Sequence, residues 1–345
     1  MVNAKKISQI FSIENDIIDD IDHLMEGKLK NKVVNDKIDP HFLPEFGKKL
    51  GFFKRSKTSQ VITFFTTKGG VLKTTLAVNT ARMAALHGVK TLVIGLDMQC
   101  DISNAIMPTD NMEHLDFDEQ LQAMSETRGL YDFYQGDMQI SDLIMPSDLE
   151  YLHLIPETPE LVLLNDHIGN LNRREFWLND RVISKLRNVY DLIILDCSPS
   201  WNRLITNALC VTDLLVSPVE CKINNLRNVE VFNQLLDEFK NDMRINFSHC
   251  LVPTKYSSQK KLSKEIYDWY QDNFENTLPY FIRESVVSEE AMALNKSLIE
   301  FKPTSRPALE MKEIVSAISH RLHQASKLNF SHLKKQESIG HGAFA

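Results

Sequence analysis

The feature that most constrains this chain is the segment VITFFTTKGGVLKTT at residues 61–75, which joins an apolar run to a glycine turn and a helical pattern. Its first five residues are β-branched or aromatic, which predicts a short strand buried inside a parallel sheet. A helical pattern follows from about residue 74 to residue 87, and Gly88 is placed to end it. In such a unit, backbone N–H groups of the turn and of the helix start converge and favour an anion. The segment therefore predicts a phosphate-binding turn.

Two side chains of this turn suit a nucleoside triphosphate bound with magnesium. Lys73 would reach the β- and γ-phosphates, and the hydroxyl of Thr74 would ligate Mg²⁺. The strict pattern G-x-x-x-x-G-K-[ST] is not met, because its two glycine positions hold Thr67 and Leu72. A Gly-Gly turn that binds nothing therefore stays open as an alternative at this point.

The octet KGGVLKTT resembles the deviant Walker A motif KGGxGK[ST] of the ParA/MinD group of P-loop ATPases. Lys68 matches the additional lysine of that motif, whereas Leu72 stands where the group usually has glycine. If this position needs a left-handed backbone, a residue other than glycine costs ~1–2 kcal/mol there. The resemblance implies an ATP site formed by the octet and by one proline of a later strand, namely Lys68, Gly69, Gly70, Val71, Leu72, Lys73, Thr74, Thr75 and Pro253.

Two further apolar runs end in an aspartate. The run TLVIGL is followed by Asp97, and the run LIIL is followed by Asp196. Ligands of open parallel sheets lie at the carboxyl ends of the strands, so both carboxylates would face the nucleotide. Asp196 resembles the aspartate of the group's segment YDxIIIDxxPS and would hold Mg²⁺ through a water. Asp97 and Gln99 match the second half of the group's motif DxDxQ, and Gly95 replaces its first aspartate.

The resemblance also implies a catalytic set, Lys68, Lys73 and Asp97, and a metal-holding pair, Thr74 and Asp196. Asp97 would orient or deprotonate the attacking water. Lys68 would reach the partner's phosphates in a dimer that encloses ATP between its subunits. Because phosphoryl transfer to water needs positioning and charge neutralisation, hydrolysis would require dimerisation and would be slow until a partner completes the site.

Composition sets wider limits. A chain of 345 residues with 43% hydrophobic and 25% charged residues suits one large α/β domain with an appendage, or two modest domains. The net charge of −7 excludes a protein that is basic all over, but it leaves room for a local basic face. Five cysteines without a C-x-x-C pair favour a reduced, cytosolic protein. An apolar run long enough to span a membrane is missing, so we expect a soluble protein.

We expect residues 1–58 to form a helical arm, residues 59–330 the ATPase domain, and residues 331–345 a disordered tail. In the arm, apolar residues recur with helical spacing at Ile18, Ile21, Met25 and Leu29. The pair Leu43-Pro44 is expected to break helices. The arm could pack on the main domain or on a second subunit, or it could be the remnant of a DNA-binding region. The tail has too few apolar positions for a membrane-binding helix.

A possible DNA-binding surface is the least constrained part of the prediction. A helix expected at about residues 257–274 carries lysines on neighbouring faces, although a solvated helix face explains such lysines equally well. ParA-type dimers present basic side chains to phosphates in this region, and such contacts would be non-specific and salt-sensitive. The candidate residues are Lys255, Lys260, Lys261, Lys264 and Arg283.

The sequence thus predicts a doubly wound, mainly parallel α/β fold of the P-loop NTPase type with a short helical N-terminal arm. The resemblance implies a cytoplasmic, nucleoid-associated homodimer that needs ATP and Mg²⁺, binds double-stranded DNA non-specifically, and segregates a plasmid or chromosome. Its ATPase activity would be stimulated by a ParB-type centromere-binding partner, without a membrane. Two alternatives are a MinD-like ATPase that positions a protein cargo and a transcriptional regulator switched by ATP.

Overall fold

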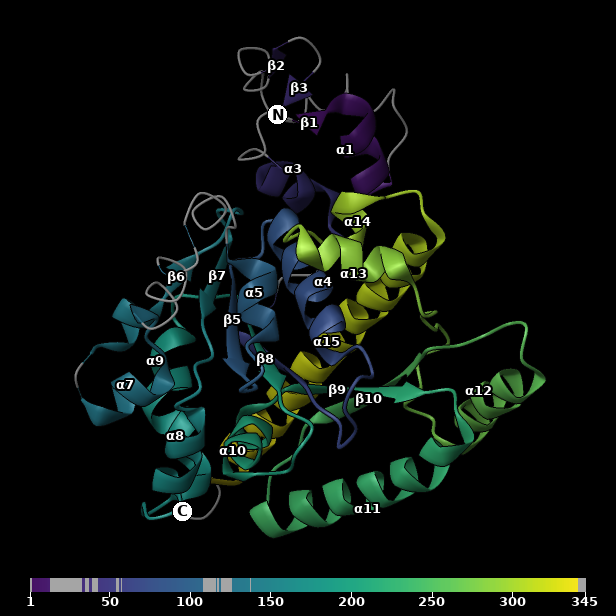
Figure 1. The fold of residues 1–345 in the computed structure, drawn as a ribbon. Coiled ribbons are helices and arrows are strands. Elements are labelled where there is room, and N and C mark those ends of the chain that lie inside the picture. Colours follow the sequence, from purple (N-terminus) through teal and green to yellow (C-terminus); the bar gives the residue numbers. More distant parts are fainter. Residues whose placement is uncertain are drawn as a thin grey trace.

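A seven-stranded sheet forms the centre of the computed structural model, with strand order β10-β9-β4-β8-β5-β7-β6 (Figure 1). All neighbouring strands are parallel except the edge pair β6 and β7, which is antiparallel. The predicted doubly wound, mainly parallel α/β fold is therefore confirmed. The strands are β4 Gln60–Phe64, β5 Thr91–Leu96, β6 Met145–Pro146, β7 Leu152–Ile155, β8 Leu192–Cys197, β9 Leu214–Glu220 and β10 Ser248–Thr254. The structure describes residues 2–12, 33–34, 37–38, 43–53, 56, 58–107, 116, 118, 126–136 and 138–340.

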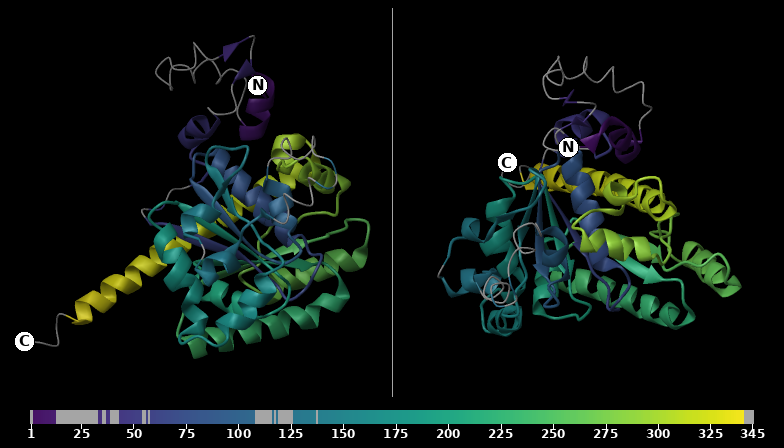
Figure 2. Two further views of the ribbon diagram at one scale, coloured as in Figure 1. Left: turned by 60° about the vertical axis from the view of Figure 1, so that its left-hand side comes forward. Right: turned by 45° about the horizontal axis from the view of Figure 1, so that its top comes forward.

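The central strands are buried on both faces because helices cover both (Figure 2). In β4, Ile62 and Phe64 belong to one hydrophobic cluster, whereas Val61 belongs to the cluster on the opposite face. The first cluster includes residues of α4 and α15, and the second includes residues of α8, α10 and α11. The longer helices are α4 Lys73–Leu86, α8 Leu161–Ile168, α10 Arg203–Val211, α11 Leu226–Met243, α12 Lys261–Asn273, α13 Val286–Ala293 and α15 Arg306–Gly340. Shorter helices are α5 Asp101–Ile106, α7 Leu130–Gln135, α9 Ser184–Leu186 and α14 Leu298–Phe301.

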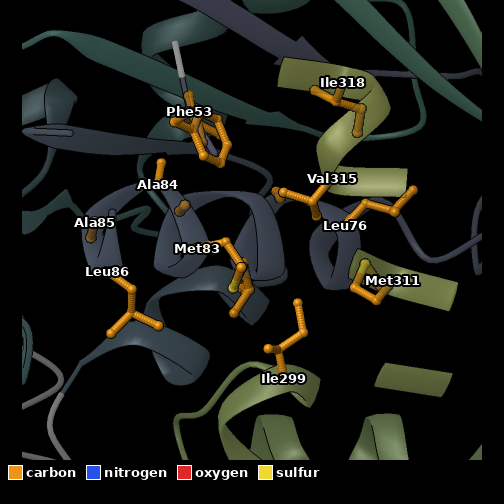
Figure 3. Packing of buried hydrophobic residues seen from close by; sticks show 14 of the residues in the cluster. Phe53, Leu76, Met83, Ala84, Ala85, Leu86, Ile299, Met311, Val315 and Ile318 are labelled. Atoms are coloured by element: carbon orange, nitrogen blue, oxygen red, sulfur yellow. The ribbon is translucent and has the colours of Figure 1, made fainter. Parts of the chain in front are cut away.

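Helix α4 is held in place by apolar side chains on most of its circumference (Figure 3). Leu76 lies against Met311 and Val315 of α15, and Met83 points toward Ile299 of α14. Each of these side chains is fully buried, and burying one stabilises the fold by about 1.5–3 kcal/mol. The helix that follows the glycine turn is therefore a fixed part of the core.

Helix α15 is longer than the sequence suggested. A disordered tail was expected at residues 331–345, but α15 continues to Gly340 and its last turns project beyond the sheet (Figure 2). The physical reason is that residues 308–339 contain neither glycine nor proline, so nothing in them stops a helix. Residues 341–345 of the expected tail lie outside the described residues.

The segment at residues 173–189 also differs from the single helix that its apolar pattern predicts. A 3₁₀ turn at Arg174–Phe176 comes first, a π-helical turn at Asn179–Ile183 follows, and α9 completes the segment. The chain enters it through Arg173, which has a left-handed backbone with φ 56°. Its buried side chains still pack on the second hydrophobic cluster, as the pattern requires.

The described part of the N-terminal arm packs on the main domain, as one of the interpretations of the arm expects. Helices α1 Ala4–Phe11 and α3 Leu43–Leu50 belong to the same hydrophobic cluster as α4, and β1 Val2–Asn3, β2 Val33–Val34 and β3 Lys37–Ile38 form a small antiparallel sheet. Leu43-Pro44 was expected to break helices, which is wrong, because proline is tolerated in the first turn, where α3 begins. The helix predicted around Ile18 lies outside the described residues.

The arm contacts the C-terminal end of α4 around one histidine. His87 is 3% exposed, its Nδ1 lies 2.7 Å from the carbonyl oxygen of Met83, and its ring stacks on Phe52 at a centroid distance of 4.7 Å. Phe11 meets the same ring edge-on at 5.1 Å. Burial lowers the pKa of His87 to about 4, so the folded protein holds this ring neutral.

We expect the stability of the protein to fall as the pH drops from about 6.5 to about 4. In this window the unfolded chain protonates His87 while the folded chain does not, so the stabilisation is complete above pH 6.5 and is lost as the pH falls toward 4. From pH 7.5 to pH 5, His87 accounts for about 2 kcal/mol of the lost free energy of unfolding. Urea titrations of the wild type and of His87→Gln at both values test this, because other buried histidines such as His249 titrate equally in both proteins. Equal losses in the two proteins would contradict the prediction.

Candidate functional site

The glycine turn leaves β4 after Phe64 and enters α4 at Lys73. Gly70 and Leu72 both have left-handed backbones, with φ 68° and φ 70°. For Leu72 this is the strained conformation considered from the sequence, at a cost of ~1–2 kcal/mol. Its half-buried side chain packs on the first hydrophobic cluster, which offsets part of this cost. The turn therefore keeps its left-handed position without a glycine.

Lys73 and Thr74 occupy the start of α4, as the sequence predicted. Lys73 is only 7% exposed, and its Nζ lies 3.4 Å from the carbonyl oxygen of Lys68, so the ammonium group folds over the turn. The hydroxyl of Thr74 donates a hydrogen bond of 2.8 Å to Oδ2 of Asp196. Asp196 lies in β8 directly beside Phe64 of β4. The predicted phosphate-binding turn and Asp196 thus meet at the carboxyl ends of two neighbouring strands.

Asp196 has the properties of a residue that receives a cation. It is 1% exposed, burial raises its pKa to about 8, and among the described residues its Oδ1 has no hydrogen-bond partner. The described residues contain no group of three or more His, Cys, Asp or Glu side chains that could hold a metal ion unaided. A threonine hydroxyl beside an unpaired carboxylate oxygen fits Mg²⁺, which takes few protein ligands and keeps several waters.

Asp97 follows β5 and begins the tight turn that leads into α5. Its Oδ1 accepts a hydrogen bond of 3.2 Å from the backbone N–H of Gln99. Its carbonyl oxygen accepts one of 3.2 Å from the backbone N–H of Cys100, which has a left-handed backbone. The carboxylate is half-buried and lies one strand away from Asp196.

The side chain of Lys68 forms an ion pair with Glu220 at the end of β9. Glu220 is 4% exposed, and Lys255 and Lys222 also lie 3.0 Å and 3.6 Å from its Oε1. Burial opposes its ionisation, but the hydrogen bonds and charges of Lys68 and Lys255 outweigh burial and lower its pKa. Sequence reasoning missed Glu220, although its place at a strand end is the signal that identified Asp97 and Asp196.

A second acidic residue that sequence reasoning missed is Glu157, which follows β7. It is 3% exposed, and burial raises its pKa although its carboxylate accepts hydrogen bonds from α5. Its signal in the sequence was weak, because Pro156 and Thr158 around it read as an ordinary turn.

Two of the residues predicted to bind DNA are already engaged within the subunit. Lys255 pairs with Glu220, and the side chain of Arg283 is 20% exposed, pairs with Glu310 and lies 4.7 Å above the ring of Phe281. The contact of these two residues with DNA stays a prediction, and it requires them to leave or share these partners. The remaining candidates are exposed at the start of α12, namely Lys260, Lys261 and Lys264.

A cavity of about 660 Å³ lies between the segments that follow β9 and β10. Lys255 and Lys222 of the Glu220 cluster line it, together with Arg306. Another lining residue, Tyr256, stacks its ring on Phe281 at 4.0 Å. The predicted nucleotide contact Pro253 is buried inside β10 and does not line this cavity.

Comparisons with known proteins identify relatives of this chain. A family model described as "AAA domain" matches residues 59–249. The chain is 26% identical over 250 residues to the chromosome partitioning protein ParA of Myxococcus xanthus, covering 72% of this chain and 83% of that protein. It is 28% identical over 261 residues to the sporulation initiation inhibitor protein Soj of Bacillus subtilis, covering 72% of this chain and 94% of that protein.

Solved structures share the fold. A plasmid partition protein from Borrelia burgdorferi is 19% identical, with a TM-score of 0.59 and coverage of 76% of this chain and 98% of that chain. Cobyrinic acid a,c-diamide synthase from Mycobacterium smegmatis, solved with an ATP analogue and magnesium, is 22% identical, with a TM-score of 0.61 and coverage of 75% and 94%. Among the described helices, none has both the length and the apolar character needed to cross a membrane.

Proposed function

Because this chain belongs to the ParA/MinD group of deviant Walker A P-loop ATPases, we propose that it binds ATP with Mg²⁺ at residues 68–75 and hydrolyses it. The observation that carries the proposal is the hydrogen bond from Thr74 to Asp196 beside the unpaired oxygen of the same carboxylate. Bound there, Mg²⁺ supplies charge neutralisation at the phosphates. The solved relative with an ATP analogue and magnesium supports the same ligand.

The residues around the turn have distinct roles in this proposal. The buried ammonium of Lys73 contacts the β- and γ-phosphates, and the amides of Gly69 and Gly70 cradle them. Thr74 and Asp196 hold the metal end of the nucleotide, the latter through a water. Asp97, half-buried on the neighbouring strand, orients the water that attacks the γ-phosphate.

We further propose that the active form is a dimer in which Lys68 leaves Glu220 and contacts the phosphates held by the partner subunit. In this dimer ATP, rather than ADP, holds the two subunits together. The sizing-column behaviour of the protein with Mg²⁺ and a non-hydrolysable ATP analogue tests this point, with Lys68→Ala as the variant that should remain monomeric.

The biological role that fits these relatives is the partition of a plasmid or chromosome in the cytoplasm. In this proposal the ATP-bound dimer resides on the nucleoid through non-specific contacts to DNA, and a ParB-type protein stimulates hydrolysis. ATPase activity with and without random-sequence DNA and the product of the adjacent gene tests the role, with Asp97→Ala as the inactive control. An ATPase rate that neither DNA nor the product of the adjacent gene raises would contradict this role. Co-sedimentation with lipid vesicles would favour a MinD-like role.

Reversing the charge of the exposed lysines at the start of α12 should weaken DNA binding at least about tenfold, because each neutralised phosphate contributes to affinity through counterion release. The variant changes Lys260, Lys261 and Lys264 to Glu, and the slope of log affinity against log salt should become shallower by roughly 3. ATP affinity should stay unchanged.

A matched control carries the same change in charge on the segment before β8, with Arg173, Arg181 and Lys185 changed to Glu. Fluorescence anisotropy with a random duplex measures both variants over a range of salt concentrations. Equal DNA affinity of the α12 variant and the wild type would move the contact surface elsewhere.

A further inference from the structure

The carboxylate of Glu157 is fixed by the first turn of α5. The backbone N–H groups of Ile102 and Ser103 donate to its Oε1 at 3.0 and 3.3 Å, and the hydroxyl of Ser103 donates to its Oε2 at 2.6 Å. The thiol of Cys100 lies 3.5 Å from the carbonyl oxygen of Glu157. Glu157 therefore holds α5 and the turn that begins at Asp97.

Gly95 is the residue that makes room for this carboxylate. A Cβ at Gly95 would lie 2.0 Å from Oε2 and 2.6 Å from Cδ of Glu157, closer than atoms in contact can approach. The carboxylate cannot easily move aside, because three hydrogen bonds hold it. Gly95 on β5 stands directly opposite Asp196 on β8 in the register of the sheet. The carboxylate of Glu157 thus fills the space that a side chain would take at Gly95, the residue paired with Asp196.

Three acidic groups consequently lie at the carboxyl ends of three neighbouring strands. Asp97 follows β5, Glu157 follows β7, and Asp196 lies in β8. Burial raises the pKa of both Glu157 and Asp196, and the charge of Glu157 contributes to the raised pKa of Asp196. Oδ1 of Asp196, which is fully buried, has no hydrogen-bond partner among the described residues. This arrangement favours a hydrated cation at these strand ends.

We propose that Glu157 is a positioning residue for the magnesium end of the nucleotide site, supplying from the segment after β7 an acidic group beside Gly95 of β5, which has no side chain of its own. It acts on the waters around the metal and holds the turn that carries Asp97. The inference rests on the proposed binding of Mg·ATP at residues 68–75. It assigns a role to a residue whose position along the chain resembles none of the nucleotide motifs.

The first test removes the charge of Glu157 and keeps its shape. In Glu157→Gln, we expect the Mg²⁺ concentration for half-maximal binding of a fluorescent, non-hydrolysable ATP analogue to rise roughly tenfold, the low end of what outer partners of metal ligands contribute. Affinity at saturating Mg²⁺ should change little. The matched control is Glu160→Gln, an exposed glutamate three residues further on, which should leave the Mg²⁺ requirement unchanged. An unchanged requirement in Glu157→Gln overturns the proposal.

The second test moves the carboxylate from one strand to the other. Gly95→Ala should lower the melting temperature through its contact with Glu157, and the same change should lower it less in a Glu157→Ala background, where that contact is absent. Gly95→Asp combined with Glu157→Ala should restore a Mg²⁺ requirement near that of the wild type, which Gly95→Ala with Glu157→Ala should not. Equal Mg²⁺ requirements of the two double variants overturn the proposal.

The two tests also separate this inference from the proposed function. A wild-type protein that binds the analogue equally well with and without Mg²⁺ overturns the proposed magnesium site, and the role of Glu157 with it. A smaller effect of Gly95→Ala on the melting temperature in the Glu157→Ala background concerns only the packing of Gly95 against Glu157. A tight, Mg²⁺-dependent wild type with an unaffected Glu157→Gln variant rejects the role of Glu157 alone.

Discussion

Replacing Arg82 by methionine should lower the free energy of unfolding by about 3–5 kcal/mol, because it leaves a buried carboxylate without its cation. Arg82 is fully buried in α4 and donates to Glu300 at 2.6 and 2.9 Å and to Asp148 at 2.7 and 2.9 Å. Burial opposes the ionisation of Glu300, but Arg82 outweighs it and lowers the pKa of Glu300 to about 2. The network ties α4 to α14 and to the segment before β7.

Urea denaturation measures this change, and two further variants are compared with Arg82→Met. Arg173→Ala removes an exposed arginine that lies 3.2 Å from Asp180, and it should cost less than about 1 kcal/mol. Arg82→Met combined with Glu300→Gln should recover part of the loss, because the buried partner at position 300 then carries no charge. A loss below about 1 kcal/mol for Arg82→Met alone would show that Glu300 finds another partner.

Replacing Lys73 by alanine should weaken the binding of a non-hydrolysable ATP analogue at least about 100-fold, since a buried charged contact to phosphate contributes roughly 3 kcal/mol. Lys73 is 7% exposed, and its Nζ contacts a carbonyl oxygen at 3.4 Å. Among the described residues, no carboxylate lies within ion-pair distance of it. The ammonium group is thus held in place without an acidic partner inside the subunit.

Thermal unfolding with and without Mg²⁺ and the analogue separates binding from folding in Lys73→Ala. At about 100 times the dissociation constant, the ligand should stabilise the wild type by about 2.7 kcal/mol and the variant hardly at all. Without ligand, the variant should be as stable as the wild type, because it loses no ion pair. Lys264→Ala, which removes an exposed lysine of α12, is the matched control. Normal analogue binding by Lys73→Ala would refute the proposed phosphate site.

Much of this architecture could be predicted from local patterns. The strand Thr91–Leu96 coincides with the apolar run TLVIGL, because buried parallel strands are short apolar runs whose ends are marked by polar residues. The start of α4 was predictable for the same reason, since the glycine turn and the helical pattern adjoin in sequence. The place of Asp196 beside Thr74 followed from the rule that strand ends share one edge of the sheet.

The features that escaped prediction depend on contacts between distant parts of the chain. The buried position of the Glu157 carboxylate depends on the space left by a glycine 62 residues earlier, and no local sequence pattern marks that pairing. The same applies to Arg82, whose carboxylate partners lie 66 and 218 residues away. The ion pairs of Lys255 and Arg283 escaped prediction for the same reason, because the carboxylates that bind them, Glu220 and Glu310, lie 35 and 27 residues away along the chain.

The cluster around Glu220 has a consequence for the proposed contact of Lys68 with a second subunit. When Lys68 swings away toward another molecule, Glu220 still has Lys255 at 3.0 Å and Lys222 at 3.6 Å. The carboxylate of Glu220 therefore keeps a cationic partner. The loss of Lys68 does not carry the cost in free energy of leaving a buried charge unpaired. In the proposed dimer, the two lysines that remain beside Glu220 would let Lys68 leave this ion pair and contact the partner's phosphates at a small cost in free energy.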